Sequence, residues 1–357
     1  MNKRSTVYDV AERAGVSIAT VSFTFRQPER VKAETRAIVR NAARELGYVP
    51  SASARGLAAG RTGVLGVYSF EILLEGADDP SGVTADAHEG DDASLRLFPL
   101  YVDVVQRGFE LECRAHGYAT MLGSASRERS EAITEIAGRV DGAAVLTGIV
   151  GEADDVATIG RAIPLVLVSQ PPNADFDSIG VENARGIREL TDHLILVHGK
   201  RDLVFVGDPG APEIGERYQG FLEALSNAGL APSGGPLPFQ GDRPPEQAAD
   251  VLDAFIRERG LPEAFVCGSD QGALSLMDVL SVLGIKVPQD TAVTGFDGII
   301  AGRISNPALT TVAQPMEQLG RRAANMLIQR LSNPTAPIKR ETLPVSLRIR
   351  HSCGCPD

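Results

Sequence analysis

Positively charged side chains are concentrated at the start of the chain, where they could bind phosphate groups. Residues 1–61 contain 11 Lys and Arg against 5 Asp and Glu, a net charge of +6. The whole chain of 357 residues carries −11, so residues 62–357 carry −17. Lysine and arginine neutralise the phosphates of a nucleic acid, whereas an acidic surface repels them. This division of charge predicts that only the N-terminal segment meets a polyanion.

Three short helices are predicted to position the side chains of this basic segment. Apolar residues at helical spacing predict a first helix over residues 7–14. Gly15 permits a tight turn, and Ser17 can cap a second helix that begins at Ile18. A third amphipathic helix is predicted over residues 33–46. Its inward-facing positions are predicted to be Ile38, Val39, Ala42, Ala43 and Leu46.

The second of these helices turns a continuous row of side chains outward. The residues of this outer face are Ile18, Ala19, Thr20, Ser22 and Phe23. Two short helices joined by a glycine turn make a helix-turn-helix, whose second helix can enter the major groove of DNA. A three-helix bundle without a nucleic-acid role is the alternative, and the basic charge argues against it. We therefore expect residues 1–50 to form a DNA-binding head.

Beyond residue 63, apolar runs of strand length alternate with amphipathic helices. Strands are predicted at 64–70, 118–124, 142–149, 164–170, 202–209, 264–270 and 291–297. Helices are predicted near 100–116, 128–138, 153–162, 184–198, 213–228, 245–259, 271–283 and 316–332. This alternation predicts parallel sheets flanked by helices. The number of units predicts two lobes, with a ligand cleft at the carboxyl ends of the strands.

Motifs spread along the chain resemble those of the LacI/GalR family of bacterial transcription regulators. They are DVAERAGVSIATVS (Asp9–Ser22), VKAETRAIV (Val31–Val39), ELGYVPSASARGLAAGRTGVLGV (Glu45–Val67), VDG (Val140–Gly142), ERYQGFLEAL (Glu216–Leu225), GFDG (Gly295–Gly298), LTTVAQP (Leu309–Pro315) and LGRRAANML (Leu319–Leu327). Each motif alone is weak, but the combination is specific and covers nearly all of the chain. The resemblance implies an all-α helix-turn-helix head and an α/β two-lobed body with the periplasmic-binding-protein-like fold.

The resemblance also divides the chain into segments. The expected segments are a head (1–50), a hinge helix or flexible linker (51–62), a two-lobed effector-binding and dimerisation domain (63–350) and a tail (351–357). Crossovers between the lobes are expected near 170–180, 297–300 and 325–330. Residues 71–98 form an insertion relative to the family, and its first part is strongly acidic. We predict a solvated acidic loop there, with a lid or dimer-edge element at the cleft mouth as the alternative.

DNA contacts follow from the family's motif positions. The base-reading positions fall on Ile18, Ala19 and Phe23. Many members have an arginine at the third position to read guanine, whereas Phe23 can offer only apolar contact, such as to a thymine methyl. The expected phosphate-positioning residues are Thr6, Tyr8, Ser17, Thr20, Ser22 and Ser51. Arg26 either adds a phosphate or base-edge contact or stays solvated, and Leu57 is expected to wedge into the minor groove.

The resemblance places effector contacts on the body. Arg217 is the strongest candidate, because its guanidinium can bind paired sugar hydroxyls or a carboxylate. Asp297 follows as an acceptor for hydroxyls, and Ser269 stands where many sugar-binding members have asparagine. Arg243 stands where an aromatic ring often stacks on the ligand, so a more polar or anionic effector becomes possible. The opposite lobe is expected to contribute Phe70 and Gln170.

The cysteine and histidine pattern predicts neither a metal site nor catalysis. Four cysteines in a chain of this length do not make a disulfide framework. Cys353 and Cys355 could hold a metal or oxidise, but a frayed tail with two incidental thiols is the prediction. His193 and His198 are not at the spacing of helical metal ligands, and no nucleophile–base arrangement stands out. We therefore expect no metal, no cofactor and no enzymatic activity.

Taken together, these features predict a homodimeric, sequence-specific transcription repressor. Its expected partners are double-stranded operator DNA and a small sugar-like or polar metabolite in the interlobe cleft. The polar N-terminus and the lack of a membrane-length apolar run predict a cytoplasmic, nucleoid-associated protein without a membrane partner. Two alternatives are a solute-binding receptor without a transcriptional role and an enzyme on the same α/β scaffold.

Overall fold

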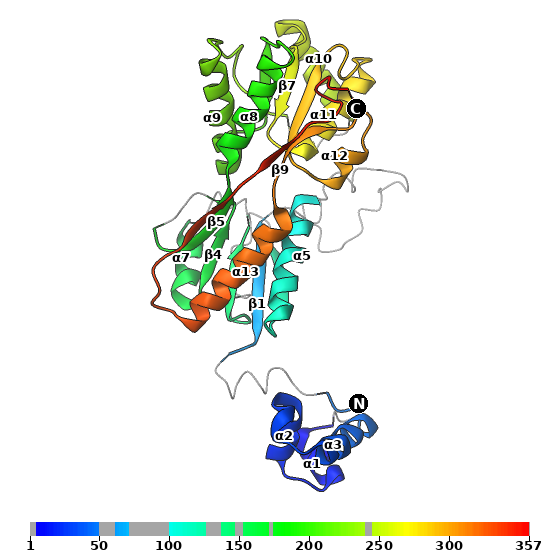
Figure 1. Cartoon of the computed structure of the whole chain (residues 1–357), viewed down its shortest axis with the longest axis vertical. Helices are drawn as coiled ribbons and strands as arrows, with labels where there is room; N and C mark the ends of the chain where they lie inside the picture. Colours follow the sequence, from blue (N-terminus) through cyan, green and yellow to red (C-terminus); the bar gives the residue numbers. More distant parts are fainter. Residues whose placement is uncertain are drawn as a thin grey trace. The chain divides into compact units, whose positions relative to one another are not determined.

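The chain forms two compact units, Met1–Gly63 and Val64–Asp357 (Figure 1). The computed structural model describes residues 5–49, 61–70, 100–125, 137–146, 153–170, 174–239 and 245–356. Several predictions therefore lie outside the described residues: Ser51, Leu57 and nearly all of the hinge, the acidic insertion 71–98, and Arg243. No helix in the described ranges is both long enough and apolar enough to span a bilayer.

The first unit is the predicted head. It contains α1 (Val7–Ala14), α2 (Ile18–Arg26), the 3₁₀ turn η1 (Pro28–Arg30) and α3 (Ala33–Glu45). The buried core comprises Val10, Ala11, Val21, Val39, Ala42 and Ala43. Ile38 was predicted to face inward but is 53% exposed. The inward stripe of α3 runs through Val39 and Ala42, and Ile38 lies one helical step, about 100°, away from it.

Local hydrogen bonds set the ends of the first two helices. Thr6 and Asp9 form a reciprocal capping box at the start of α1. Gly15 ends α1 with a left-handed φ of 65°, which a residue without Cβ adopts at little cost. Ser17 Oγ accepts the amide N–H of Thr20 at 3.1 Å and so caps α2 as predicted. These local interactions fix the angle at which α2 leaves the turn.

The second unit, which we call the body, contains two sheets. Sheet A has the strand order β10-β5-β4-β3-β1-β2, and its neighbouring strands are parallel. Its strands are β1 (Val64–Phe70), β2 (Ala119–Ala125), β3 (Gly142–Val145), β4 (Leu165–Val168), β5 (Asp177–Val181) and β10 (Arg340–Leu343). Sheet A and its helices α5 (Leu100–Ala115), α7 (Ala153–Ala162) and α13 (Met316–Ser332) form lobe A.

Sheet B has the order β11-β9-β8-β7-β6 and is parallel except for the antiparallel pair β11–β9. Its strands are β6 (Leu203–Val206), β7 (Ala264–Cys267), β8 (Ala292–Asp297), β9 (Thr310–Ala313) and β11 (Ser346–Arg348). Its helices are α8 (Asn183–Leu196), α9 (Pro212–Asn227), α10 (Pro245–Arg259), α11 (Asp270–Val282) and α12 (Ile300–Ile304). This sheet and these helices form lobe B.

Each sheet buries both faces, as parallel sheets require. On β6, Leu203 and Phe205 pack with α8 and α9, whereas Val204 and Val206 pack with α10 and α11. In lobe A, α5 and α13 share one core and α7 covers the other face. A Cβ added at Gly320 of α13 would collide with the backbone of α5, so this helix pair crosses in direct backbone contact.

The chain passes between the lobes at three points among the described residues. They are Glu182 between β5 and α8, Gln314–Pro315 between β9 and α13, and Pro344–Val345 between β10 and β11. The predicted crossover at 170–180 precedes the first of these, because β5 adds one more strand to sheet A. The predictions at 297–300 and 325–330 are wrong. The former residues lead into α12 of the same lobe, and the latter lie inside α13.

The tail is not frayed, contrary to the prediction for residues 351–357. Ser352 is fully buried and Cys353 is 1% exposed. Ser352 Oγ accepts the N–H of Thr310 at 2.9 Å and donates to the carbonyl oxygen of Val293. Because these partners lie at the starts of β9 and β8, the tail packs against the amino-terminal edge of sheet B.

Candidate functional site

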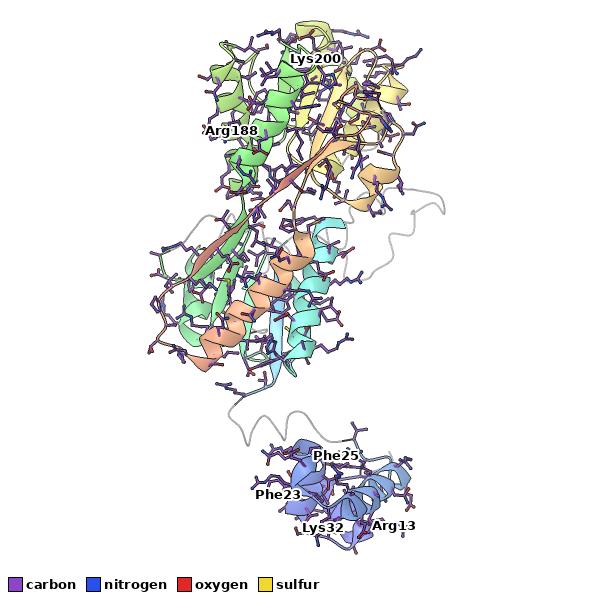
Figure 2. All side chains as sticks on the ribbon, in the orientation of Figure 1. Arg13, Phe23, Phe25, Lys32, Arg188 and Lys200 are labelled. Carbon is purple, nitrogen blue, oxygen red and sulfur yellow. The ribbon has the colours of Figure 1, made fainter. Side chains whose placement is uncertain are left out.

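The outer face of α2 carries exposed apolar side chains on the head. Ile18 is 42% exposed and Phe23 is 39% exposed, and Tyr8 of α1 is 67% exposed. The guanidinium of Arg30 lies 5.0 Å from the centroid of the Phe23 ring. Phe25, two residues on, instead packs beside Tyr48, at 6.1 Å between ring centroids. Figure 2 labels both phenylalanines on the head. Phe23 is therefore held on the surface beside a cation, where it can offer only apolar or cation–π contact.

The other predicted DNA-contacting residues of the described head lie on or beside the same helix. Ala19 is exposed, Thr20 and Ser22 are half-buried, and Arg26 is exposed at the last turn of α2. Thr20 Oγ1 lies 2.9 Å from Ser17 Oγ, so these two hydroxyls already form a pair. Thr6 caps α1. The predicted contacts of the described head thus lie on α2 and its cap, except for Thr6 and Tyr8 at the start of α1.

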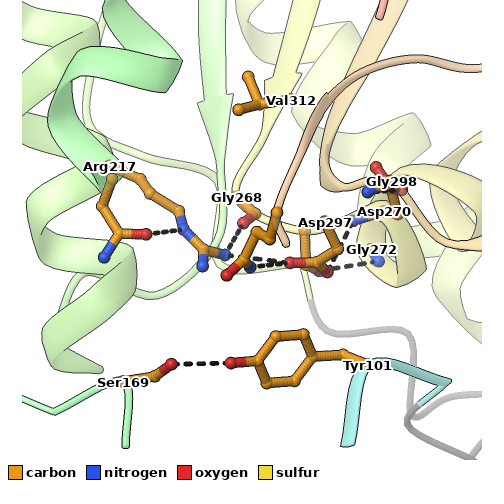
Figure 3. Close-up of polar contacts among 12 residues, drawn as sticks. Tyr101, Ser169, Arg217, Gly268, Asp270, Gly272, Asp297, Gly298 and Val312 are labelled. Carbon is orange, nitrogen blue, oxygen red and sulfur yellow. Dashed lines mark hydrogen bonds and ion pairs between the residues drawn. The ribbon is translucent and has the colours of Figure 1, made fainter. Parts of the chain in front are cut away.

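The centre of the body holds a buried arginine and a buried aspartate. Arg217 of α9 is 5% exposed and Asp297, the last residue of β8, is 7% exposed. Arg217 Nη1 lies 3.7 Å from Asp297 Oδ1 and donates to the carbonyl oxygen of Gly268 at 2.6 Å. Its guanidinium carbon lies 3.8 Å from the centroid of the Phe296 ring. The two predicted effector residues are therefore neighbours in one network (Figure 3).

Two further residues of this network lie at the crossovers between the lobes. Asn183 Oδ1 accepts Arg217 Nε–H at 2.9 Å, and Asn183 begins α8 directly after the first crossover. Gln314 Nε2 donates to Asp297 Oδ1 at 2.7 Å, and Gln314 lies in the second crossover. Gln314 Oε1 is buried and makes no hydrogen bond within the described residues. Sequence reasoning missed both residues, although Gln314 stands within LTTVAQP and Asn183 lies two residues after the end of β5.

A second aspartate supports the loop after β8. Asp270 is fully buried at the first turn of α11 and accepts the amide N–H groups of Gly298 and Ile299 at 2.7 and 2.9 Å. Ser269 caps α11 by accepting the Gly272 amide at 3.1 Å, so its hydroxyl proton stays free to donate. Asp270 was not predicted as a site residue. The sequence Gly268-Ser269-Asp270 also fits the ordinary start of a helix, where aspartate is common.

Burial dominates the electrostatics of this network. It raises the pKa of Asp297 to about 7, with Arg217 opposing the rise and Asp270 adding to it. Burial likewise raises the pKa of Asp270 and of Glu213, a neighbour of Arg217 at the start of α9. Desolvation penalises the charged form of a carboxyl group, so a site of this kind gains from a ligand that supplies hydrogen-bond donors.

Lobe A contributes a facing pair of hydroxyls. Tyr101 Oη and Ser169 Oγ lie 2.7 Å apart, and Figure 3 shows them opposite the Arg217–Asp297 pair. Burial raises the pKa of Tyr101, and the charges of Asp297 and Arg217 act on it from lobe B. Gln170 Nε2 donates to the carbonyl oxygen of Leu146 at 3.3 Å. Phe70 ends β1, and the placement of its side chain lies outside what the structure describes.

Backbone strain marks the same place from both sides. Within the described residues, the non-glycine positions with positive φ are Ser169, at 56°, and Asp297, at 135°. Such conformations cost about 1–3 kcal/mol each and persist where the surroundings enforce them, commonly at ligand sites. A small cavity between the lobes is lined by Ser169, Gln170, Asn183 and Glu213 among others. The arrangement can bind a polar molecule that offers both donors and acceptors.

Two family models match the chain. "Bacterial regulatory proteins, lacI family" matches residues 6–51, and "Periplasmic binding protein-like domain" matches residues 191–353. The chain is 32% identical over 338 residues to the HTH-type transcriptional repressor PurR of Erwinia tasmaniensis, covering 92% of this chain and 91% of that protein. It is 31% identical over 343 residues to the repressor of the same name from Pectobacterium atrosepticum, with the same shares covered.

Solved structures match along the same length. The lac repressor dimer bound to operator and the anti-inducer ONPF gives a TM-score of 0.77 at 24% identity, covering 98% of this chain and 99% of that one. The transcriptional regulator CelR in complex with cellobiose gives a TM-score of 0.66 at 26% identity, covering 98% and 100%. The head and the two-lobed body thus occur together in these proteins.

Proposed function

The chain belongs to the LacI/GalR family of bacterial transcription regulators, and on that premise we propose that it is a homodimeric repressor controlled by a small molecule bound in its body. The curated relatives are named transcriptional repressors, and one solved neighbour is a dimer bound to operator. Two heads in a dimer would read two half-sites of a pseudo-palindromic operator. Such a protein acts on DNA in the cytoplasm, and its role is regulation without catalysis.

One observation carries the control by a small molecule. The side chains that would bind the effector are hydrogen-bonded to residues in or next to two of the crossovers between the lobes. Arg217 bonds Asn183, which follows the first crossover, and Asp297 bonds Gln314 in the second. A ligand that binds Arg217 or Asp297 competes with, or reinforces, these bonds. It thereby changes the relative free energies of the open and closed lobe arrangements, which is the requirement for a conformational switch.

The chemistry of the network defines the class of effector. Within the described residues, Arg217 Nη2 makes no hydrogen bond, so one edge of the guanidinium is available to a ligand acceptor. Asp297 and Gln314 Oε1 offer acceptors, and the Tyr101–Ser169 pair offers hydroxyls. A small polar metabolite with several hydroxyl or N–H groups satisfies these partners, in keeping with a sugar-like ligand.

The DNA side of the proposal rests on α2 and the segment that follows the head. Ile18, Ala19 and Phe23 face a major groove, and the hydroxyls of Thr6, Ser17 and Thr20 are proposed to position phosphates. Phe23 favours a thymine-bearing half-site over one with guanine at that position. Tyr8, Ser22, Arg26 and Ser51 are proposed as further backbone contacts, with Leu57 as the minor-groove wedge.

A binding assay on genomic DNA tests the proposal. DNA fragments from the promoter of the protein's own gene and from the promoters of neighbouring genes are titrated with the full-length protein. Each titration is run with and without candidate metabolites. We expect a shift on at least one fragment, and an at least tenfold change in its affinity with one metabolite. No shift on any fragment would instead support a solute-binding receptor.

Two variants control this assay. Ala19→Glu places a carboxylate on the exposed face of α2 and should abolish the shift without removing a core contact. Val282→Glu places the same charge on a body helix at a side chain that is 55% exposed. If both variants lose binding equally, α2 is not the reading element.

A further inference from the structure

Four side chains that can bind a metal meet in lobe B, at the edge of the sheet where the tail packs. They are His193, His198, Cys353 and Cys355, and one ligand atom from each lies within 4.8 Å of all the others. His193 is in the last turn of α8, His198 follows that helix, and the cysteines are in the tail. We propose that this cluster binds one Zn²⁺ ion, which holds the tail against α8.

The spacing of the donor atoms matches a tetrahedral site. Nε2 atoms of His193 and His198 are 3.2 Å apart. Cys355 Sγ is 3.6 Å from His193 Nε2 and 3.3 Å from His198 Nε2, and Cys353 Sγ is 3.7 Å from His193 Nε2. Ordinary zinc bond lengths place tetrahedral N···N pairs about 3.3 Å apart and N···S pairs about 3.6 Å apart. Four of the six donor pairs therefore have tetrahedral spacing. The other two, Cys353 Sγ with Cys355 and with His198, lie within 4.8 Å, so an ion at the centre would draw Cys353 closer to them.

The donor set selects zinc and a structural role. Two thiolates and two imidazoles in a tetrahedral arrangement suit Zn²⁺ better than the oxygen-preferring Mg²⁺ or Ca²⁺. Four protein ligands leave no position for water, which distinguishes a structural zinc site from a catalytic one. A neutral imidazole offers one ring-nitrogen lone pair to a metal ion. Binding would release the protons of the two thiols.

The surrounding structure holds the ligands in place before any ion binds. Ser352 anchors the tail to β8 and β9 one residue before Cys353, whose Sγ also accepts the Thr310 hydroxyl at 3.1 Å. Gly354 has a φ of 103° and lies against the His198 ring, where an added Cβ would be 3.6 Å from two ring atoms. This turn directs both flanking thiols to the histidines. The buried anchor at Ser352 and the helix α8 thus hold the two halves of the cluster close together.

Metal analysis of the full-length protein tests the proposal. After dialysis against metal-free buffer, we expect inductively coupled plasma mass spectrometry to give about one zinc ion per chain. Cys355→Ser and His198→Asn should each reduce this content severalfold, because each variant removes one of the four ligands and so weakens zinc binding. Cys113→Ala, a buried cysteine of lobe A, is the matched control and should keep the full content.

A second measurement avoids dependence on the variants. The unaltered chain, stripped of metal under reducing conditions, is titrated with Co²⁺, which should give the visible bands of tetrahedral cobalt and a thiolate-to-cobalt charge-transfer band. Removing the metal should also lower the thermal unfolding midpoint of the body by about 5 °C.

Three results would overturn the site. One is a chain that takes up neither zinc nor cobalt, and another is zinc content that does not change in Cys355→Ser. The third is a mass deficit of two hydrogens together with indifference to zinc, which would indicate a Cys353–Cys355 disulfide instead. An unchanged midpoint on complete zinc removal would refute the structural role.

Discussion

The head and the body place their functional side chains in opposite environments. On the head, the cations Arg26, Lys32 and Arg40 are exposed, whereas Arg217 and Asp297 of the body are 5% and 7% exposed. Charges at a surface are screened by salt, whereas buried charges are screened little and titrate with their neighbours. Ionic strength should therefore act on DNA binding by the head, and pH on the buried site of the body. Each prediction below tests that separation.

Salt should produce the largest effect, and only at the head. A dimer that neutralises 6–10 phosphates loses about 10³- to 10⁵-fold in operator affinity between 50 and 200 mM salt. Effector affinity, set by buried groups, should change by less than about threefold over the same range. Fluorescence anisotropy for DNA and calorimetry for the effector measure the two slopes. Equal salt slopes would contradict the comparison.

Arg217→Met should produce the next largest effect, confined to the body. Removing hydrogen bonds of a charged group costs about 1.5–3 kcal/mol, so effector affinity should fall roughly 100-fold while operator affinity stays within about threefold. The effect is measured as the metabolite concentration that changes the mobility shift by half. Arg188→Met is the matched control, because Arg188 lies on the neighbouring α8 and forms an exposed ion pair with Glu223. A variant of Arg217 that still responds normally would remove it from the site.

Asp297 should make the body sensitive to pH. Its pKa in the folded state is about 7, above the ordinary 3.8. Between pH 3.8 and 7 the folded protein therefore binds a proton at Asp297 that the unfolded chain does not. Its contribution to stability is therefore greatest at low pH and is lost as pH rises towards 7, with a slope of up to about 1 kcal/mol per pH unit.

Asp297→Asn should remove this slope. Thermal unfolding midpoints of the variant and the unaltered chain are compared between pH 5.5 and 8. A smaller slope from Asp270 should remain in the variant, because burial also raises the pKa of that carboxyl. Asp250→Asn changes an exposed carboxyl of α10 and should leave the profile as it is in the unaltered chain. A profile that is the same with and without Asp297 would show that this carboxyl stays ionised.

Ser17 gives the smallest effect and separates folding from DNA binding within the head. Ser17→Ala loses the cap of α2 and should destabilise the head by about 1 kcal/mol. Ser17→Asp keeps a capping oxygen and should keep stability, but its charge faces phosphates and should weaken operator binding about tenfold. Chemical denaturation and anisotropy measure the two quantities. If both variants bind DNA equally well, Ser17 does not face the backbone.

The head could be predicted from the sequence almost completely because its determinants are local. Thr6 and Asp9, Gly15, and Ser17 and Thr20 set three helix ends through contacts no more than four residues apart. The one misplaced core residue, Ile38, borders the buried stripe of α3, where apolarity alone cannot separate edge from centre.

The body could be predicted as a class but not in its connections. Its buried strands β3, β4, β6 and β7 are continuous apolar runs that a sequence reveals. The missed strands include β10 and β11, which are short and largely exposed. They also include β5 and β9, in which polar and apolar residues are mixed. Because these strands carry or flank the crossovers, missing them displaced the crossovers too.

Long-range contacts limited what could be predicted of the sites. Arg217 and Asp297 were predicted from motifs, but their partners Asn183 and Gln314 come from segments 34 and 17 residues away. The His–Cys cluster joins residues about 160 apart. Helical spacing could not relate His193 to His198, because α8 ends at Leu196, between them.

An odd number of passages between the sheets leaves the two ends of the body on different halves. Its first strand, β1, belongs to sheet A, whereas its last strand, β11, belongs to sheet B. A donor fluorophore near Val64 and an acceptor on the final residues would therefore be attached to lobe A and lobe B, respectively. Energy transfer between the two fluorophores would report the opening and closing of the two lobes in solution, without any label inside the effector site.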